Sequence, residues 1–183
     1  PFHFSTLENP KLLSILKNAD ICINLKTTCE SKESHLEKSI YTFNKELIEI
    51  IKKSFTIKKF IFFSGLGTEK RSTLRNEIIS KTEELITKEL KNSIIIRPSV
   101  ILGNGDQFLS NLLPIFKMSF FIPLFGDGSK KFQPVLIEDI VDFVSNLIEL
   151  PNLDDGLFEL GGPDIFTYRE FYTLISNLMS KKR

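Results

Sequence analysis

The chain has few residues of the kinds that bind metals or form disulfides. Its 183 residues include two cysteines and two histidines, His3 and His35. Cys22 lies in an apolar segment and Cys29 in a polar one, with no Cys-x-x-Cys spacing. This arrangement predicts neither a disulfide framework nor a zinc site, so no metal ligand is expected. A reducing compartment is the default for such a chain.

The chain also lacks an excess of charge of either sign. Its 24 basic and 23 acidic residues leave a formal net charge of +1, so no overall field attracts nucleic acid or an anionic membrane. No apolar run reaches the roughly 20 residues that a transmembrane helix needs, and the N-terminal residues show no signal-peptide pattern. We therefore expect no nucleic-acid partner and no transmembrane segment.

The nearest approach to a long apolar run is residues 108–125, which polar residues and Pro114 interrupt. This pattern is typical of a core helix followed by a strand. The alternative is a helix that touches a membrane surface or a partner protein, which leaves peripheral membrane contact open.

What the chain does have is the composition of a globular protein, 42% hydrophobic and 26% charged, in a length that suits one domain or a large part of one. Its first half alternates apolar strands with amphipathic helices. We expect a short helix from Asn9-Pro10, strands at 20–25, 58–63 and 93–97, a long helix with inner residues from Leu36 to Ile51, and a helix at 73–90. This alternation predicts the α/β class, with a parallel sheet.

Beyond Gly103 the pattern is less regular and predicts a small α+β subdomain. We expect helices near 108–113 and at 138–150, strands near 121–124, 132–136 and 157–160, and a last helix opened by a capping box of Thr167 and Glu170. Residues 1–105 are expected to form an α/β domain. Residues 106–183 are expected to form the subdomain, which returns one strand and one helix to the main sheet.

Two predicted strand ends indicate where a ligand would bind. Residues 60–105 read as strand, helix and strand, which builds parallel sheet. Ligands of open parallel sheets lie beyond the carboxyl ends of the strands. The sequence therefore predicts a site around residues 64–67 and 97–100.

The strand at 20–25 lacks the features that protect a sheet edge. It is apolar on both faces and contains no Pro, bulge or Lys. Such a strand is expected to have a neighbour on each side, and only the strand at 58–63 is available. We therefore expect the chain to be a fragment whose first strands are absent.

Several segments together carry a family resemblance: INL at 23–25, FFSGLG at 62–67, SKTEE at 80–84, IIIRPSVILGNGD at 94–106, FQPVLIEDI at 132–140 and FELGGPDIFTYRE at 158–170. In this order they resemble the later two-thirds of an atypical, extended short-chain dehydrogenase/reductase. More narrowly, the chain is similar to the nucleotide-binding accessory subunit of respiratory complex I (NADH:ubiquinone oxidoreductase) and its alphaproteobacterial relatives. The similarity runs nearly from end to end.

The resemblance implies that residues 1–105 are the C-terminal part of a domain whose Rossmann-like parallel sheet holds NAD or NADP. Residues 106–183 would be the subdomain that closes over the nicotinamide. It places the strand end after Ile23 beside the adenosine and phosphates, the next strand end near the nicotinamide ribose, and the third beside the nicotinamide ring. The implied contacts are Asn24, Leu25, Lys26, Ser64, Gly65, Lys81, Pro98, Ser99 and Val100. Gln133 and Asp139 match a subdomain motif that we interpret as structural.

Each of these residues also has a plainer interpretation. Ser64 can satisfy a backbone group at the strand end, and Lys81 can be a solvated helix residue. Gly161-Gly162-Pro163 is first of all a turn.

The chain departs from the superfamily pattern at three places. Active members have a Tyr as general acid four residues before the Lys, whereas this chain has Glu77 there, which is ionised at neutral pH unless buried. The glycine-rich loop that holds the pyrophosphate does not occur, so this chain alone should bind dinucleotide poorly or not at all. Lys26 replaces a small residue, and it could either pair with a phosphate or obstruct the cofactor.

We favour a non-catalytic or degenerate accessory subunit with complex I subunits as partners, in the mitochondrial matrix, where it could lie peripheral to the inner membrane, or in the bacterial cytoplasm. One alternative is an active NAD(P)-dependent oxidoreductase or epimerase/dehydratase with an atypical acid, such as Glu77. The other is a cofactor-free module that binds a protein partner through residues 108–125.

Overall fold

The computed structural model describes residues 7, 12–27, 32–54, 56–118, 124, 126–150 and 155–180. The predicted helix start at Asn9-Pro10, His3, Cys29 and most of the predicted strand at 121–124 lie outside these residues. The chain forms two compact units. The first consists of Pro1–Arg97 and Leu147–Glu159, and the second of Pro98–Asn146 and Leu160–Arg183.

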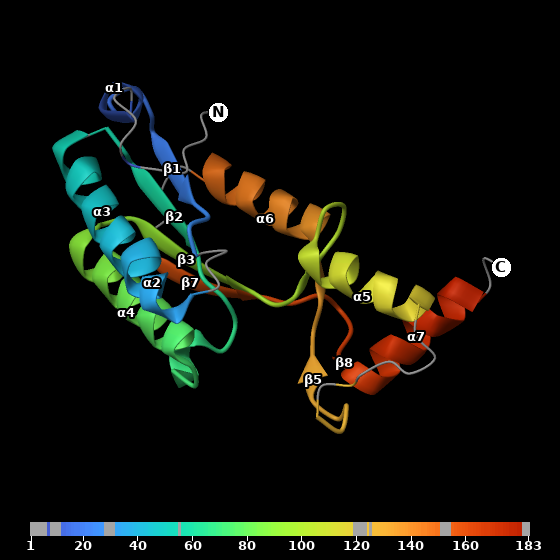
Figure 1. The fold of residues 1–183 in the computed structure, drawn as a ribbon. Coiled ribbons are helices and arrows are strands. Elements are labelled where there is room, and N and C mark those ends of the chain that lie inside the picture. The colour runs from blue at the N-terminus through green and yellow to red at the C-terminus, as the bar shows by residue number, and fades with distance from the viewer. Residues whose placement is uncertain are drawn as a thin grey trace. The chain divides into compact units, whose positions relative to one another are not determined.

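The first unit contains a four-stranded sheet in the order β1-β2-β3-β7 (Figure 1). Its strands are β1 (Ile21–Asn24), β2 (Lys59–Phe63), β3 (Ser93–Pro98) and β7 (Gly156–Leu160). β1 pairs with β2, and β2 with β3, in parallel. Their carboxyl ends therefore meet at one edge of the sheet, as the sequence predicted.

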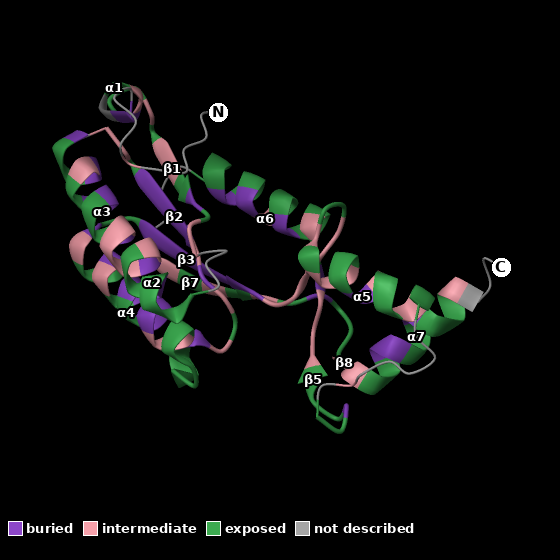
Figure 2. Cartoon of the chain, in the orientation of Figure 1, coloured by how far each residue is buried: buried purple, intermediate pink, exposed green. Residues whose placement is uncertain are grey.

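One helical layer covers a face of this sheet (Figure 1). It is formed by α2 (Glu33–Glu37), the π-helical segment η1 (Lys38–Thr42), α3 (Phe43–Ser54) and α4 (Leu74–Glu89), while the short helices α1 (Leu12–Leu16) and η2 (Thr68–Lys70) flank the strands. Phe60 and Phe62 of β2 and Ile95 of β3 pack with buried residues of these helices into one core. Figure 2 shows the central strands as the most continuously buried part of the sheet.

The second unit combines short strands with helices. Its elements are β4 (Ile101–Leu102), α5 (Gln107–Met118), β5 (Lys131–Phe132), β6 (Val135–Leu136), the first part of α6 (Ile137–Glu149), β8 (Phe166–Thr167) and α7 (Tyr168–Ser180). β4 pairs with β6 in parallel, and β5 with β8 in antiparallel orientation. Phe108, Phe132, Phe166 and Phe171 form a cluster of tilted and edge-on ring contacts beside this ladder.

The α/β class and the Rossmann-like sheet are confirmed, and three details differ from the predictions. The single strand predicted at 132–136 is two short strands, β5 and β6, which belong to different sheets. Helix α5 continues past Pro114 to Met118. The long second helix contains a π-helical turn. Within the described ranges, no helix combines the length and the apolarity needed to cross a bilayer.

Candidate functional site

The end of β1 is held by a pair of buried asparagines. Asn24 is 6% exposed and Asn44, on α3, is 0% exposed. The Asn24 amide donates to Asn44 Oδ1, while Asn24 Oδ1 accepts from the backbone N–H of Lys26 at 2.8 Å. Asn44 in turn donates to the Ile40 carbonyl at 2.7 Å, within the π-helical turn. The Asn24 side chain is thus engaged in shaping the chain after β1, and Leu25 is 67% exposed.

Lys26 turns toward the helical layer. Its Nζ lies 5.5 Å from the centroid of the Phe43 ring, a cation–π distance. The ammonium therefore already has a partner on α3 in the absence of a phosphate.

The loop after β2 is anchored to the neighbouring strand and to itself. The Ser64 N–H donates to the Ile96 carbonyl of β3 at 2.7 Å, and Ser64 is 9% exposed. The Gly65 carbonyl accepts from the Thr68 N–H at 3.4 Å and lies 3.0 Å from the Thr68 hydroxyl. A Cβ added to Gly65 would meet no atom within 4 Å. The loop therefore has room for an external group beside Gly65.

Lys81 is paired with Glu77, the residue at the position where the resemblance implies a tyrosine. Its Nζ lies 2.8 Å from Glu77 Oε1, one turn earlier on α4, and both side chains are about half exposed. The hydrogen bond and the charge of Lys81 lower the pKa of Glu77, and the same bond raises the pKa of Lys81. At neutral pH the pair is a carboxylate and an ammonium.

The third predicted segment begins the second unit. Pro98 is the last residue of β3, and the Ser99 N–H donates to the Leu160 carbonyl at 2.8 Å. The Val100 carbonyl accepts from the Val135 N–H at 2.9 Å. These contacts place Ser99 and Val100 at the start of the second unit's own strand network.

The FQPV and GGP segments contact each other within the second unit. Gln133 Nε2 donates to the Gly162 carbonyl, and the Gly162 N–H donates to the Pro134 carbonyl at 3.0 Å. A Cβ on Gly162 would come 2.2 Å from that carbonyl oxygen. Gly162 is thus a point of close backbone approach as well as a turn residue. Asp139 is exposed in the first turn of α6.

An ionic cluster at the end of β3 was not anticipated from the sequence. Arg97 contacts the carboxylates of Glu69, Glu83 and Glu159. Its partners raise the pKa of the Arg97 guanidinium above its already high usual value, and the hydrogen bond that Arg97 donates to Glu83 contributes most. Glu83 also contacts Thr68 in the loop after β2. Glu83 belongs to the SKTEE segment, which is part of the resemblance, but that segment does not indicate which residues Glu83 contacts.

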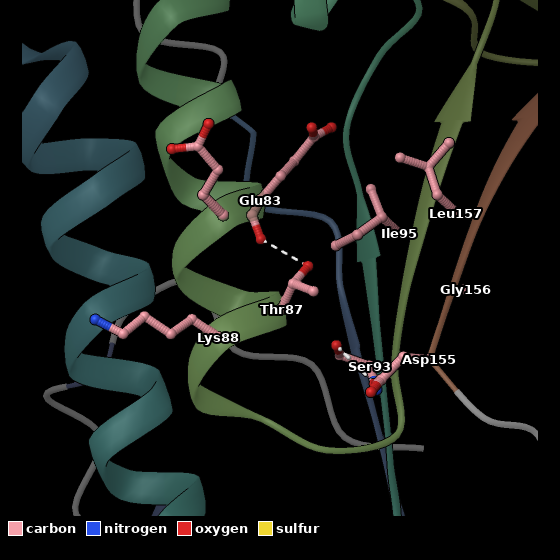
Figure 3. Close-up of a pocket in the computed structure, with 9 residues that line it drawn as sticks. Glu83, Thr87, Lys88, Ser93, Ile95, Asp155, Gly156 and Leu157 are labelled. Atoms are coloured by element: carbon pink, nitrogen blue, oxygen red, sulfur yellow. Dashed lines mark hydrogen bonds between the residues drawn. The ribbon is translucent and has the colours of Figure 1, made fainter.

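A hollow of about 610 Å³ lies between α4 and the strands β3 and β7 (Figure 3). Asp155 Oδ1 accepts from the Ser93 N–H at 2.6 Å and lies 3.1 Å from the Ser93 hydroxyl. Ser93 is the first residue of β3 and Asp155 precedes β7, so this hollow extends toward the end of the strands opposite to the predicted ligand edge.

Metal and thiol chemistry have no visible support in the described part of the chain. It contains no cluster of three or more His, Cys, Asp or Glu residues arranged to hold a metal ion. Burial raises the pKa of the Cys22 thiol to about 11, which leaves the sulfur protonated and unreactive at neutral pH.

The sequence comparisons confirm the resemblance. The chain is 27% identical over 186 aligned positions to "NADH dehydrogenase [ubiquinone] 1 alpha subcomplex subunit 9, mitochondrial" of Arabidopsis thaliana, covering 98% of the chain and 45% of the relative. The protein of the same name from Dictyostelium discoideum is 23% identical, with 96% of the chain and 49% of that protein covered. The chain spans about half the length of these curated relatives. No family model matches it.

The solved structures confirm the fold. MoeE5 in complex with UDP-glucuronic acid and NAD superposes with a TM-score of 0.83 at 13% identity, covering 96% of this chain and 67% of that one. TunA, an NAD-dependent NDP-hexosamine 5,6-dehydratase, has a TM-score of 0.75 at 13% identity, covering 92% and 64%. A human epimerase family protein with NADPH has a TM-score of 0.68 at 16% identity, covering 92% and 67%.

Proposed function

We propose, from relatives named as complex I subunits and from the fold of NAD-binding epimerases and dehydratases, that the chain is part of a nucleotide-binding accessory subunit that does not itself transfer hydride. Its partners would be other subunits of respiratory complex I or of a bacterial relative. It would act in the mitochondrial matrix, peripheral to the inner membrane, or in the bacterial cytoplasm.

The observation that carries the non-catalytic part is the pairing of Glu77 with Lys81 at 2.8 Å. In active members of the superfamily the ammonium lowers the pKa of a phenol that then donates a proton. Here the partner is a half-exposed carboxylate whose pKa is lowered further. It is deprotonated at neutral pH, so it has no proton to give.

The nucleotide part of the proposal concerns the carboxyl edge of β1, β2 and β3. Gly65 has open space beside it, and Ser64 has its backbone fixed to β3. We assign the nicotinamide ribose to Ser64 and Gly65, and the adenosine and phosphates to the chain after β1. Pro98, Ser99 and Val100 remain proposed neighbours of the nicotinamide ring, and residues 106–183 the subdomain that closes over it. The choice between NAD and NADP is left to experiment.

The binding test uses the chain as it is, labelled with ¹⁵N and titrated with NADH, NADPH, nicotinamide mononucleotide and AMP. We expect amide shifts at Ser64 and Gly65 with nicotinamide mononucleotide at millimolar affinity, and smaller shifts there with AMP. Millimolar binding corresponds to about 4 kcal/mol, a reasonable value for half of a dinucleotide. No shift at these amides with any of the four compounds would refute nucleotide binding and favour a cofactor-free module.

The catalytic test measures oxidation of NADH and NADPH with quinones and small carbonyl compounds as acceptors. We expect no turnover above buffer. Turnover at ordinary enzymatic rates that Glu77→Gln abolishes would instead support an oxidoreductase with an atypical acid.

The assembly test follows the tagged chain in native gels of its source organism. We expect the chain to migrate with complex I, and migration only as free protein would contradict the assembly role.

A further inference from the structure

A buried ion pair joins helix α4 to the end of strand β3. Arg97 Nε lies 3.0 Å from Glu83 Oε1, and Arg97 Nη2 lies 2.6 Å from Glu83 Oε2. The two side chains are 11% and 8% exposed. This is the bidentate geometry that fixes both the position and the plane of a carboxylate. Glu83 therefore has little freedom to rotate.

Glu83 also reaches the loop that follows β2. Thr68, which is 2% exposed, has its hydroxyl 3.2 Å from Glu83 Oε1, 3.0 Å from the Gly65 carbonyl and 3.4 Å from the Ser64 hydroxyl. A threonine hydroxyl has a single proton and can accept two hydrogen bonds. Thr68 can therefore donate only one of these three hydrogen bonds.

The charge of Glu83 decides that order. A hydrogen bond to an ionised carboxylate is about twice as strong as one between neutral groups, so the Thr68 proton is directed to Glu83. The Gly65 carbonyl keeps its bond from the Thr68 N–H. Ser64 then donates to Thr68 Oγ1, which leaves the lone pairs of Ser64 Oγ free to accept a bond from a ligand hydroxyl.

Stability alone does not account well for this arrangement. A buried ion pair is often no more stabilising than apolar residues of the same volume, because both charges lose their hydration. The other two carboxylates near Arg97, those of Glu69 and Glu159, are about half exposed at 3.4 Å and are screened by water. What the pair does uniquely is to orient the Thr68 hydroxyl.

We propose that Glu83, held by Arg97, is a positioning residue that acts through the Thr68 hydroxyl on Ser64 and fixes residues 64–67 in a conformation that accepts a ribose hydroxyl. This inference rests on the proposed nucleotide-binding function and adds to it the residues that prepare the loop. The probe for it is nicotinamide mononucleotide.

The test compares Thr68→Val, which keeps the shape but loses the hydroxyl, with Thr68→Ser, which keeps the hydroxyl. We expect Thr68→Val to weaken nicotinamide mononucleotide binding about tenfold, the effect of losing one oriented hydrogen bond. Thr68→Ser should bind within about twofold of the wild type, and Glu83→Gln should weaken binding because a neutral amide competes less for the Thr68 proton. Thr87→Val is the matched control, since the Thr87 hydroxyl donates to the Glu83 backbone carbonyl within α4, at 3.0 Å. Nicotinamide mononucleotide should bind this variant as it binds the wild type.

A second measurement needs no nucleotide. Hydrogen exchange of the Ser64, Gly65 and Thr68 amides should be faster in Thr68→Val than in Thr68→Ser and the wild type, after correction for the free energy of unfolding measured in urea. If the wild type binds no nucleotide, the proposed function is wrong, and unequal exchange would still support the ordering of the loop. Equal affinities and equal exchange for the valine and serine variants would overturn the inference.

Discussion

Glu77 and Lys81 perturb each other's titration in opposite directions. The hydrogen bond and charge of Lys81 lower the pKa of Glu77, and the bond to Glu77 raises the pKa of Lys81. A lowered carboxyl pKa stabilises the fold above the ordinary Glu range, and this contribution is lost as the pH falls through the folded-state pKa. A raised lysine pKa stabilises it below the ordinary Lys range, and this is lost as the pH rises through the raised value. Because both groups are half exposed, the effect on stability is small.

We predict that Lys81→Met returns the pKa of Glu77 toward its ordinary value. Methionine keeps the length of the side chain but removes the ammonium that stabilises the carboxylate. The measurement is an NMR titration of the Glu77 side-chain carboxyl carbon in both proteins. Lys88→Met, which removes a different cation from the same helix, should leave the Glu77 midpoint where it is. Identical midpoints in wild type and Lys81→Met would show that the pair does not form in solution.

Asn24 illustrates what residue-level reasoning missed. The strand end at Asn24 was predicted correctly, but its side chain donates to Asn44 and accepts from the Lys26 N–H. Asn44 stands 20 residues later and faces Asn24 only after the π-helical turn. Hydrophobic spacing predicts which face of a helix is buried, but it does not predict that a polar residue on that face has a partner across the sheet.

Strand β2 and helix α6 are joined by a buried lysine. Lys59, 7% exposed, donates from Nζ to the Leu147 carbonyl at 2.6 Å and to the Leu150 carbonyl at 2.8 Å. These carbonyls belong to the C-terminal end of the helix, where they lack helical partners and where the helix dipole favours a cation. Lys59 therefore serves as a C-terminal cap supplied by another element.

We predict that Lys59→Met lowers the free energy of unfolding by about 2 kcal/mol, because it leaves carbonyls without their charged donor. Urea denaturation followed by circular dichroism measures this. Lys58→Met is the matched control, because Lys58 precedes Lys59 and forms an exposed ion pair. It pairs with Asp20 at 2.8 Å, and both side chains are more than two-thirds exposed. If both variants lose the same stability, the capping role is wrong.

The elements that were predicted best are those with the strongest pattern. β2 and β3 were predicted because a strand buried on both faces is a continuous apolar run. β1 is also a continuous apolar run, although it lies at the edge of this sheet and is only partly buried. β5 and β6 were predicted as one strand because each has only two residues, too few to show a period. The pairing of β5 with β8 and of β6 with β4 depends on distant residues and left no local signal.

At the scale of the whole molecule, the first unit is built from two segments that are separated along the chain by most of the second unit. Its second segment, Leu147–Glu159, supplies most of β7 and the carbonyls that Lys59 caps. It also supplies Glu159, which contacts Arg97, and Asp155, which accepts a hydrogen bond from Ser93. A first unit without this segment would lose a neighbour of β3 together with several buried polar partners. We therefore expect that residues 1–97 do not fold into the first unit without residues 147–159.

We predict that a chain ending at Asn146 loses most of the amide protection of β3 and unfolds without a sharp transition. The reason is that β7 and the Asp155 partner of Ser93 are removed together. Hydrogen exchange and thermal denaturation of this chain and of one ending at Ser180 make the comparison, and the latter should behave like the full chain. Wild-type protection of β3 in the shorter chain would contradict the prediction.

The resemblance to the complex I subunit could be inferred from the sequence because several short segments occur in a fixed order. No single segment would suffice, and these four relatives are 23–28% identical to the chain. The ionic cluster around Arg97 could not be inferred, because its members come from η2, α4, β3 and β7 and meet only after the sheet has formed.

The open space beside Gly65 allows an effect on ligand binding to be distinguished from an effect on folding with a single added methyl group. A methyl group at this position would touch no atom of the residues that the structure describes, so their packing gives no reason for a glycine there. Alanine there would fold as glycine does, and any difference between the two proteins would report on a molecule from outside the chain.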